Sequence, residues 1–269
     1  MSWLKDLFAT EQPIIGLLHL RPLPGDPFFG PEDTIQGVIE AARTDLLALQ
    51  EGGVDGVLIT NEFSLPYEKK VSAVTTTSMG MVIGALSPLF TIPFGAEAIY
   101  DGDATIELCA ATGASFTRCL FTGAWAGDLG LVDRDVSRTL RLKRNLGLDK
   151  LRLFYFVTSE GEVFLNDRST VEIAKTLLFN CRPDCLVVGG SAPGRNPGPE
   201  LVRTVKQAVG QTPVVCGTGC RLDNVADILA AGDGAFVGTT FKKDGKFENA
   251  IDAVRVKQFM DRVKEVRKD

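Results

Sequence analysis

Short apolar runs recur along the chain, and each follows a stretch in which apolar residues have helical spacing. One phrase opens several of these runs: a glycine or another small residue, an Asp or small residue, and then four or five apolar residues. It occurs at residues 52–59, 112–117, 183–188 and 231–237. Glycine after a helix is typical of a left-handed C-cap, and a short, wholly apolar run fits a parallel strand buried on both faces. The pattern therefore predicts alternating β-α units.

The pattern predicts eight strands, at residues 14–20, 56–61, 94–99, 115–120, 151–157, 185–189, 213–216 and 234–238. Eight helices alternate with them, at residues 34–51, 67–86, 103–112, 135–146, 170–180, 199–209, 223–231 and 248–266. An open doubly wound sheet typically has a Gly-x-Gly-x-x-Gly turn after its first strand, and this chain has none. We therefore predict an α/β fold, a (β/α)8 TIM barrel that forms one domain over residues 1–269, with 1–12 as a short N-terminal helical segment.

Composition and charge agree with a single large core and limit the classes of molecule that the protein is expected to bind. The chain has 269 residues, of which 45% are hydrophobic, and a net charge of −5. Nucleic-acid binding is disfavoured, because it depends on clustered Lys and Arg. No stretch is long and apolar enough for a membrane span, and residues 1–8 are too short and too charged for a signal peptide. We expect a cytoplasmic protein.

Two glycine-rich turns, Gly217-Thr218-Gly219 and Gly238-Thr239-Thr240, follow the last two predicted strands. In a barrel of eight units, the loops at these places commonly bind phosphate through backbone N–H groups and a nearby helix N-terminus. The loop at 189–198 follows the sixth strand, contains four glycines and offers Arg195 as a charge contact. These three loops predict a site for a small phosphorylated molecule. The expected phosphate ligands are Gly190, Ser191, Gly217, Thr218, Gly219, Gly238 and Thr239.

Candidate catalytic residues stand where strands end, because a barrel builds its active site there. His19, the only histidine, ends the first strand and is either an acid or base or a structural residue. Glu97 lies in an apolar strand, so it needs a partner, and Arg118 on the next strand can supply one. That pair is either structural or a base beside an anion-binding guanidinium. Asn61 can orient a substrate.

Other candidate chemistry is weaker. Glu62, Glu97 and Asp101 are candidate ligands for a divalent cation such as magnesium, but we expect no resident metal or cofactor. Lys242 and Lys243 are expected to face solvent, which disfavours a Schiff-base mechanism. The six cysteines form no Cys-x-x-Cys pair and are expected to be buried free thiols. The glycine-rich segment 123–130 is expected to be a loop, either a lid or a compact surface loop.

Four segments together resemble the BtpA/SgcQ family: 15–25, which contains His-Leu-x-Pro-Leu-Pro-Gly, then 217–224, 236–245 and 252–256. The resemblance covers nearly the whole chain and implies a phosphate-binding TIM barrel of poorly defined activity. The family names refer to photosystem I biogenesis and to a sugar-metabolism gene cluster. The chain departs from the family pattern in three places. Residues 157–162 lack the usual Lys-His pair, 62–67 replace an acidic Gly-Asp-x-Pro-Phe stretch, and Glu97 stands where Asn is expected.

Two hypotheses of function follow. In the first, the chain is an enzyme acting on a small phosphorylated metabolite by proton transfer or lyase-type chemistry, with His19 and Glu97 as the acid–base pair and Arg118 or Asn61 orienting the substrate. In the second, it is a catalytically degenerate barrel that serves as an assembly or biogenesis factor. A homo-oligomer in which Trp3, Leu7 and Phe8 pack on a neighbour is compatible with either.

Overall fold

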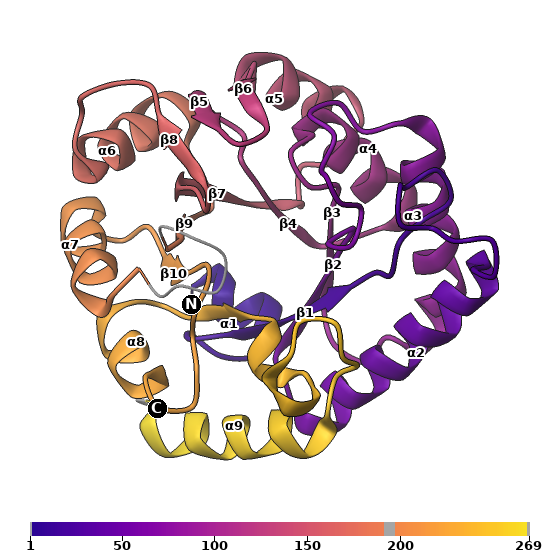
Figure 1. Ribbon diagram of the computed structural model, residues 1–269. Coiled ribbons are helices and arrows are strands. Elements are labelled where there is room, and N and C mark those ends of the chain that lie inside the picture. Colours follow the sequence, from indigo (N-terminus) through magenta and orange to yellow (C-terminus); the bar gives the residue numbers. More distant parts are fainter. Residues whose placement is uncertain (1, 191–196, 268–269) are drawn as a thin grey trace.

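The computed structural model describes residues 2–190 and 197–267, and its centre is a closed ring of parallel strands (Figure 1). The order around the ring is β1-β11-β10-β9-β7-β4-β3-β2, and each strand pairs in parallel with its neighbours. The strands are β1 (Ile14–His19), β2 (Gly56–Thr60), β3 (Phe94–Glu97), β4 (Phe116–Cys119), β7 (Arg152–Thr158), β9 (Cys185–Val188), β10 (Val214–Cys216) and β11 (Ala235–Val237). The predicted TIM barrel is confirmed, and all eight predicted strands are present.

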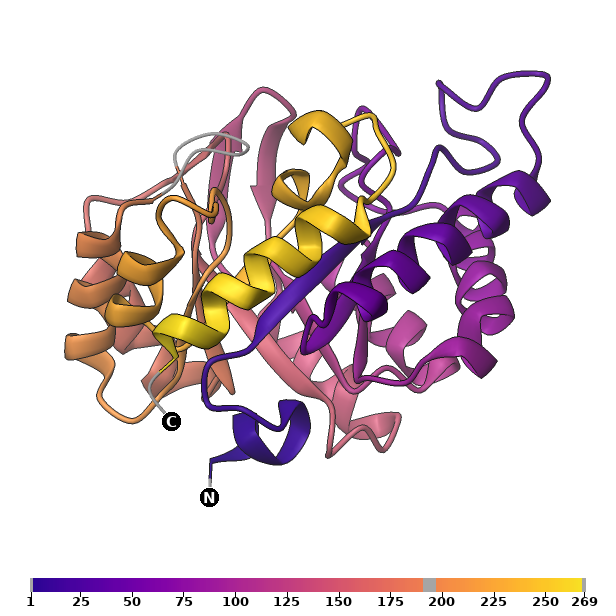
Figure 2. The ribbon, with the colours of Figure 1, turned by 90° about the horizontal axis from the view of Figure 1, so that it is seen from below.

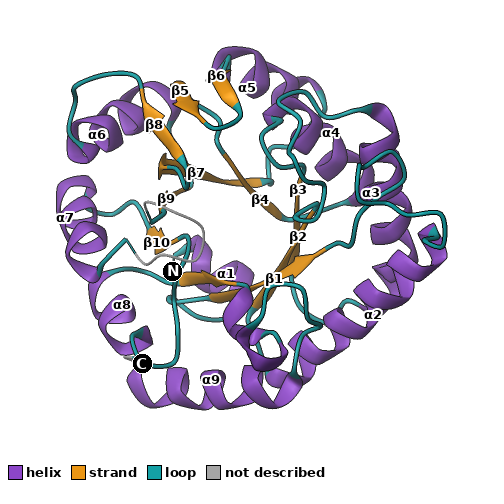
Figure 3. Ribbon diagram, in the orientation of Figure 1, coloured by secondary structure: helices purple, strands orange, loops and turns teal. Residues whose placement is uncertain are grey.

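Helices form an outer ring around the strands (Figure 3). They are α2 (Ile35–Gly52), α3 (Ala73–Leu86), α4 (Gly102–Thr112), α5 (Val136–Asn145), α6 (Thr170–Cys181), α7 (Pro199–Val209), α8 (Val225–Ala231) and α9 (Ala253–Val266), with the 3-10 turns η1 (Ser87–Leu89), η2 (Thr239–Phe241) and η3 (Lys243–Gly245). Side chains cap several N-termini, as at Thr34 and Asp101, and Ser169 forms a capping box with Glu172. No helix in the described chain is long and apolar enough to cross a membrane.

The repeated Asp before a strand has a structural explanation. The Asp55 carboxylate accepts a hydrogen bond from the Ile14 N–H at 2.7 Å, on the neighbouring strand β1. Asp233 does the same for the N–H of Val214, at 2.8 Å, at the start of β10. Asp184 accepts from the first residues of β7 in the same way. Each carboxylate therefore satisfies a backbone donor at the amino end of an adjacent strand, where the parallel ladder begins.

The helix α1 (Trp3–Phe8) closes the amino end of the barrel (Figure 2). Phe8 is buried inside the ring of strands, with its ring centroid 5.2 Å from that of Phe116, and Trp3 lies edge-on to Phe154 at 5.6 Å. Of the three side chains that the homo-oligomer hypothesis names, Phe8 packs inside the chain's own barrel, while Trp3 and Leu7 are only partly buried. The homo-oligomer hypothesis stays a prediction.

A small antiparallel sheet, absent from the sequence analysis, stands between β4 and α6. Its strands are β5 (Ala124–Gly127), β6 (Gly130–Asp133) and β8 (Glu162–Phe164), in the order β6-β5-β8. Trp125 is buried in it, packs edge-on against Phe164 at 4.7 Å and donates its indole N–H to the carbonyl of Thr122 at 2.7 Å. The prediction of a loop over 123–130 was therefore wrong. The segment is a hairpin fixed to the barrel by its tryptophan.

The predicted helices at 67–86 and 248–266 begin later than expected, at Ala73 and Ala253. In both cases the residue before the helix caps it: Ser72 accepts from the N–H of Thr75, and Asp252 accepts from that of Val254.

All six cysteines are free thiols, and five of them are buried, while Cys181 is partly exposed.

Candidate functional site

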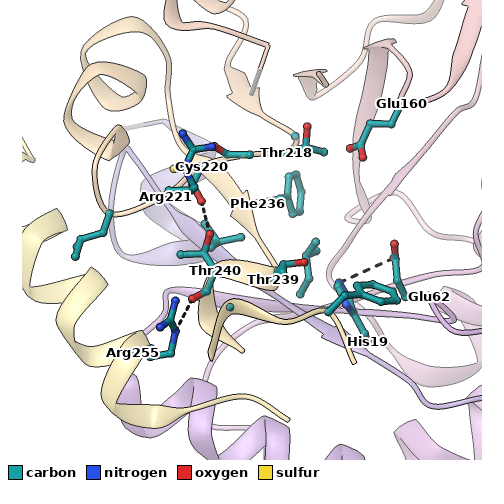
Figure 4. Close-up of a pocket in the computed structure, with 18 of the residues that line it drawn as sticks. His19, Glu62, Glu160, Thr218, Cys220, Arg221, Phe236, Thr239, Thr240 and Arg255 are labelled. Atoms are coloured by element: carbon teal, nitrogen blue, oxygen red, sulfur yellow. Dashed lines mark hydrogen bonds and ion pairs between the residues drawn. The ribbon is translucent and has the colours of Figure 1, made fainter. Parts of the chain in front are cut away.

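A cavity of about 770 Å³ opens at the carboxyl ends of the barrel strands, and Figure 4 shows residues that line it. These strand ends lie opposite α1 (Figure 2). Residues from or directly after β1, β2, β4, β7, β10 and β11 line the cavity, together with one residue of α9. The carboxyl end of a barrel is where enzymes of this fold place their chemistry. Its lining includes His19, Glu62, Arg118, Glu160, Arg221 and Arg255.

Two glycine loops form one side of the cavity. Gly217–Cys220 follow β10 and Gly238–Thr240 follow β11, and all of these residues line the cavity. Gly219 has φ of 68°, a left-handed conformation that glycine adopts without steric cost, so the first loop can turn back toward the second. The Thr240 hydroxyl donates to the carbonyl of Cys220 at 2.9 Å and joins the two loops. The sequence analysis expected this juxtaposition.

Two arginines stand at this side of the cavity. Arg255, on α9, donates through Nε to the carbonyl of Thr240 at 3.1 Å, which places its guanidinium beside the second glycine loop. Arg221 follows the first loop and forms an ion pair with Asp223 at 3.3 Å. Both lie in segments that carry the family resemblance, 217–224 and 252–256, but neither was predicted as a site residue, because Arg255 lies on a helix well after its loop and the direction of its side chain does not follow from the sequence. Asp223 also lines the cavity and offsets the charge of Arg221, so Arg255 supplies the net positive charge beside the glycine loops.

His19 ends β1, the strand next to β11, and lies against Gly238 of the second glycine loop. It is 6% exposed, and neither Nδ1 nor Nε2 has a hydrogen-bond partner among the described residues. Phe247 packs on its ring, with centroids 5.6 Å apart, and Phe63 packs on Phe247 at 4.6 Å. Burial, with smaller contributions from Lys242 and Arg118, lowers the pKa of His19 to about 4, while Glu62 opposes that fall. His19 is therefore neutral at pH 7, so that one ring nitrogen can accept a proton and the other can donate a hydrogen bond.

Glu62 is the carboxylate nearest to His19 in the cavity. The register that pairs His19 with Thr60 brings it there, and Glu62 Oε2 lies 4.0 Å from His19 Nε2. Tyr67 donates its hydroxyl to Oε1 at 3.2 Å, and Thr60 donates to Oε2 at 3.3 Å. These two hydroxyls fix the carboxylate beside the imidazole. The sequence analysis named Glu62 as a candidate metal ligand and not as a partner of His19.

Arg118 forms part of the cavity floor. Its Nε and Nη2 lie 3.2 and 3.1 Å from Glu97 Oε2, and its Nη1 donates to the carbonyl of Gly217 at 3.4 Å. The guanidinium also lies over the rings of Phe236 and Phe156, at 4.7 and 5.1 Å. The predicted pairing of Arg118 with Glu97 across adjacent strands is confirmed. It fixes the guanidinium at the centre of the barrel mouth.

Glu97 lies behind Arg118 and is not among the residues that line the cavity. Burial raises the pKa of Glu97 to about 7, and Glu62 adds to that rise, although Arg118 opposes it. The structure thus separates the two residues first considered as an acid–base pair: His19 lines the cavity and Glu97 supports a residue that does.

The remaining candidates occupy different places. Asn61 accepts a hydrogen bond from the N–H of Ile99 at 2.8 Å and lines a second, smaller cavity of about 180 Å³. The N–H of Gly190 donates to the Thr218 hydroxyl at 3.0 Å, so Gly190 connects the loop after β9 to the glycine loop after β10. Ser191 and Arg195 lie outside the described residues.

Lys242 does not face solvent as expected. It is 1% exposed, and its ammonium donates to the carbonyl of Asn249 at 3.0 Å and lies over the rings of Phe63 and Phe247, at 5.3 and 5.7 Å. The expectation was wrong because the two rings and the aliphatic stem bury a cation that still keeps a carbonyl partner. Burial lowers the pKa of Lys242 from its ordinary value. Lys243 is exposed, as expected.

The three carboxylates considered as magnesium ligands do not converge. Glu97 binds Arg118, and Asp101 caps α4 and lies 3.3 Å from Lys70 Nζ. Glu62 is held by the hydroxyls of Tyr67 and Thr60. Within residues 2–190 and 197–267, no group of three His, Cys, Asp or Glu side chains is arranged to hold a metal ion.

Comparison with known proteins places the chain in a family. The model of the BtpA family matches residues 10–265. The chain belongs to the BtpA family. It is 43% identical over the full length of both chains to the putative sgc region protein SgcQ of Escherichia coli. It is 30% identical to the photosystem I biogenesis protein BtpA of Synechocystis, with 96% of this chain and 90% of that one covered.

The fold also resembles those of solved TIM barrels outside the BtpA family. A thiamine phosphate pyrophosphorylase from Pyrococcus furiosus superposes with a TM-score of 0.58 at 18% identity, covering 96% of this chain and 98% of that one. At this identity the likeness concerns the fold alone. In this BtpA-family chain, the loop after β7 that lacks the expected Lys-His pair brings Glu160 to the cavity instead.

Proposed function

We propose that this chain is an enzyme that acts on a small phosphorylated metabolite by proton transfer or lyase-type chemistry. The observation that carries the proposal is the content of one cavity, which combines two glycine loops and two arginines with a buried histidine whose ring nitrogens have no partner among the described residues. Arginines and backbone amides suit phosphate oxygens. A neutral imidazole next to a carboxylate suits proton transfer.

In this proposal the loops after β9, β10 and β11 hold the phosphate. Gly217, Thr218 and Gly219 contact it from one loop, Gly238 and Thr239 contact it from the other, and Arg255 supplies positive charge. Gly190 contributes by holding Thr218 in place.

Beside the second glycine loop, His19 is the proposed acid or base. Glu62 lies 4.0 Å from it. Its carboxylate orients the imidazole or stabilises the positive charge that the ring gains when it takes a proton. Arg118 contacts developing negative charge from the floor, and Glu97 positions Arg118. Asn61 receives no substrate contact, since its side chain lines the smaller cavity.

Phosphate binding is tested by thermal unfolding with inorganic phosphate, with sodium chloride at equal ionic strength as the reference. We expect phosphate to raise the melting temperature of the wild type. The melting temperature of Arg255→Met should change little when phosphate is added. Arg262→Met is the matched control, because Arg262 is an exposed arginine on the same helix that forms an ion pair with Glu265 at 2.8 Å. If phosphate stabilises none of the three proteins, the proposed phosphate site is refuted.

Catalysis is tested on the first substrate that such a screen identifies. His19→Gln keeps a polar side chain of similar length but cannot exchange a proton near neutral pH, so its turnover should fall by about 100-fold or more. A variant that retains full turnover removes His19 from the mechanism.

The alternative function is that of a catalytically degenerate barrel that acts as an assembly factor. Phe247 covers one side of His19 and Phe63 packs on Phe247, and the relative with 30% identity is named a photosystem I biogenesis protein. Affinity purification from the native host, with the wild type and with Arg255→Met, separates the two functions. A stable protein partner that is lost with the variant, together with no turnover on any phosphorylated compound, supports the assembly role.

A further inference from the structure

His19 touches the loop after β11 that is proposed to hold the phosphate. A Cβ added to Gly238 would lie 3.0 Å from both Cε1 and Nε2 of the imidazole, so the ring packs against the backbone of this loop. The contact follows from the order of the barrel, because β1 ends at His19 and pairs with β11, which Gly238 follows. A charge held by this loop therefore acts on the imidazole at short range.

The imidazole faces a carboxylate with which it forms an incomplete pair. His19 is 6% exposed, and neither of its ring nitrogens has a hydrogen-bond partner among residues 2–190 and 197–267. Glu62 Oε2 lies 4.0 Å from Nε2, which a movement of about 1 Å would turn into a hydrogen bond. Figure 4 shows the two side chains facing each other. Because an unpaired buried polar group is unfavourable, we expect another state of the site to complete this pair.

The charges around His19 explain why the pair is incomplete. Burial is the main cause that lowers the pKa of His19, and the cations Lys242, which follows η2, and Arg118, on β4, lower it further. Glu62, which follows β2, is the carboxylate that opposes them. A neutral imidazole binds a carboxylate less strongly than an imidazolium does, because charge strengthens the hydrogen bond. The full strength of the pair therefore requires a proton on His19.

A bound phosphate supplies charge that favours this proton. A negative charge nearby stabilises the imidazolium and so raises its pKa. A unit charge at about 6 Å, with an effective dielectric constant of about 20, raises the pKa by roughly 2. A phosphate dianion at the loop of Gly238 carries more than one unit of charge, and Arg255, which donates to the carbonyl of Thr240, offsets part of it. We therefore expect a rise of at least about 1.

We infer that binding of a phosphate dianion transfers a proton from solvent to His19, which then pairs with Glu62 and enters the reaction as an acid. The inference rests on the proposed phosphate site and adds to it the direction of proton transfer. In the free protein the imidazole is neutral near pH 7, and in the complex it carries the proton that the substrate receives. An unphosphorylated compound leaves His19 uncharged, so the phosphate controls the chemistry as well as the affinity.

Nuclear magnetic resonance of the single imidazole tests the inference in a buffer without oxyanions. The pKa of His19 is measured in the free protein and at saturation with sulfate, which stays dianionic throughout the titration, or with glycerol 3-phosphate. We expect a midpoint near 4 in the free protein and a midpoint higher by at least about 1 in either complex. Glycerol at the same concentration is the matched uncharged probe and should leave the midpoint unchanged.

Three variants show which side chains carry the effect. Arg255→Met should bind neither dianion and keep the midpoint of the free protein. In Glu62→Gln the carboxylate that accepts from the imidazolium is lost, so the midpoint in either complex should lie at least about 1 below that of the wild-type complex. Glu265→Gln removes an exposed carboxylate on α9 that pairs with Arg262, and it should keep the wild-type midpoints.

The outcomes separate this inference from the proposed function. If isothermal titration shows that neither sulfate nor glycerol 3-phosphate binds the wild type, the phosphate site and the inference are both overturned. If a dianion binds and the midpoint of His19 rises by less than about 1, the phosphate site stands and the inference alone is overturned. An equal rise with glycerol also overturns the inference, as does a Glu62→Gln complex with the midpoint of the wild-type complex.

Discussion

The protonation of His19 offers a direct test of the site, because this is the only histidine in the chain. Its burial beneath Phe247 lowers its pKa from 6.5 to about 4. The imidazole resists protonation in the folded state but not in the unfolded chain. It therefore makes the free energy of unfolding larger above pH 6.5 than at acidic pH. That contribution is lost as the pH falls from 6.5 toward 4, since the unfolded state then binds the proton more readily.

The size of the effect follows from the two pKa values. The difference between 6.5 and about 4 corresponds to roughly 3 kcal/mol when it is fully expressed, and to roughly 2.5 kcal/mol at pH 4.5. Urea unfolding of the wild type and of His19→Gln at pH 7.5 and 4.5 measures it. Comparing the wild type with the variant cancels the contribution of the carboxyl groups that titrate in both proteins. We expect the wild type to lose about 2.5 kcal/mol more than the variant between these two pH values.

Nuclear magnetic resonance gives the pKa itself, because one histidine produces one imidazole signal to follow. The expected midpoint lies near 4. Phe247→Ala is the companion variant: it removes the ring that covers His19 and should move the midpoint upward, toward 6.5. A wild-type midpoint at or above 6, with equal acid sensitivity of wild type and His19→Gln, would refute the reasoning that His19 is held neutral by burial.

Three substitutions test the packing around the site and the barrel by urea unfolding. In Gly238→Ala the new Cβ would lie 3.0 Å from Cε1 and Nε2 of His19. We therefore expect the free energy of unfolding to fall by about 1–3 kcal/mol and the imidazole signal to shift. A variant as stable as the wild type would contradict the tight contact. Gly80→Ala adds its Cβ in open space inside α3 and should stabilise the protein by about 0.5–1 kcal/mol, whereas a loss would indicate an unseen contact. Phe8→Ala should cost about 3–5 kcal/mol without changing the mass measured by light scattering; a change in mass would support a role of α1 in assembly.

The barrel was predictable because its signals are local. Each β-α unit carries its own strand, its own capping residue and, in three places, an Asp that bonds the neighbouring strand, as Asp55 does to Ile14. The small sheet escaped prediction because its third strand pairs across a long stretch of sequence, with Trp125 opposite Phe164, and each strand has only three or four residues. Such short strands, one of them made mostly of glycine and alanine, show no alternation from which a sheet can be inferred.

The sequence predicted those residues of the candidate site that stand at the ends of strands. His19 and Arg118 were expected because each stands at the end of a strand, and the glycine loops were expected from their order along the chain. Glu160 and Arg255 escaped, because the conformations of a loop and a helix decide whether their side chains reach the cavity. Lys242 escaped for a similar reason: one of the two rings that bury it, Phe63, belongs to a distant unit.

The floor of the cavity connects its chemistry to the stability of the barrel. Arg118 stacks on Phe236, which belongs to the aromatic interior that α1 closes at the other end, and it also bonds the carbonyl of Gly217 in the first glycine loop. Glu97 fixes the guanidinium from behind, so Arg118 cannot move toward a ligand without breaking contacts with the strands. The positive charge at the floor is therefore preorganised, and a ligand does not have to order it. The same rigidity means that a substitution at Arg118 must disturb the barrel interior and the first glycine loop together.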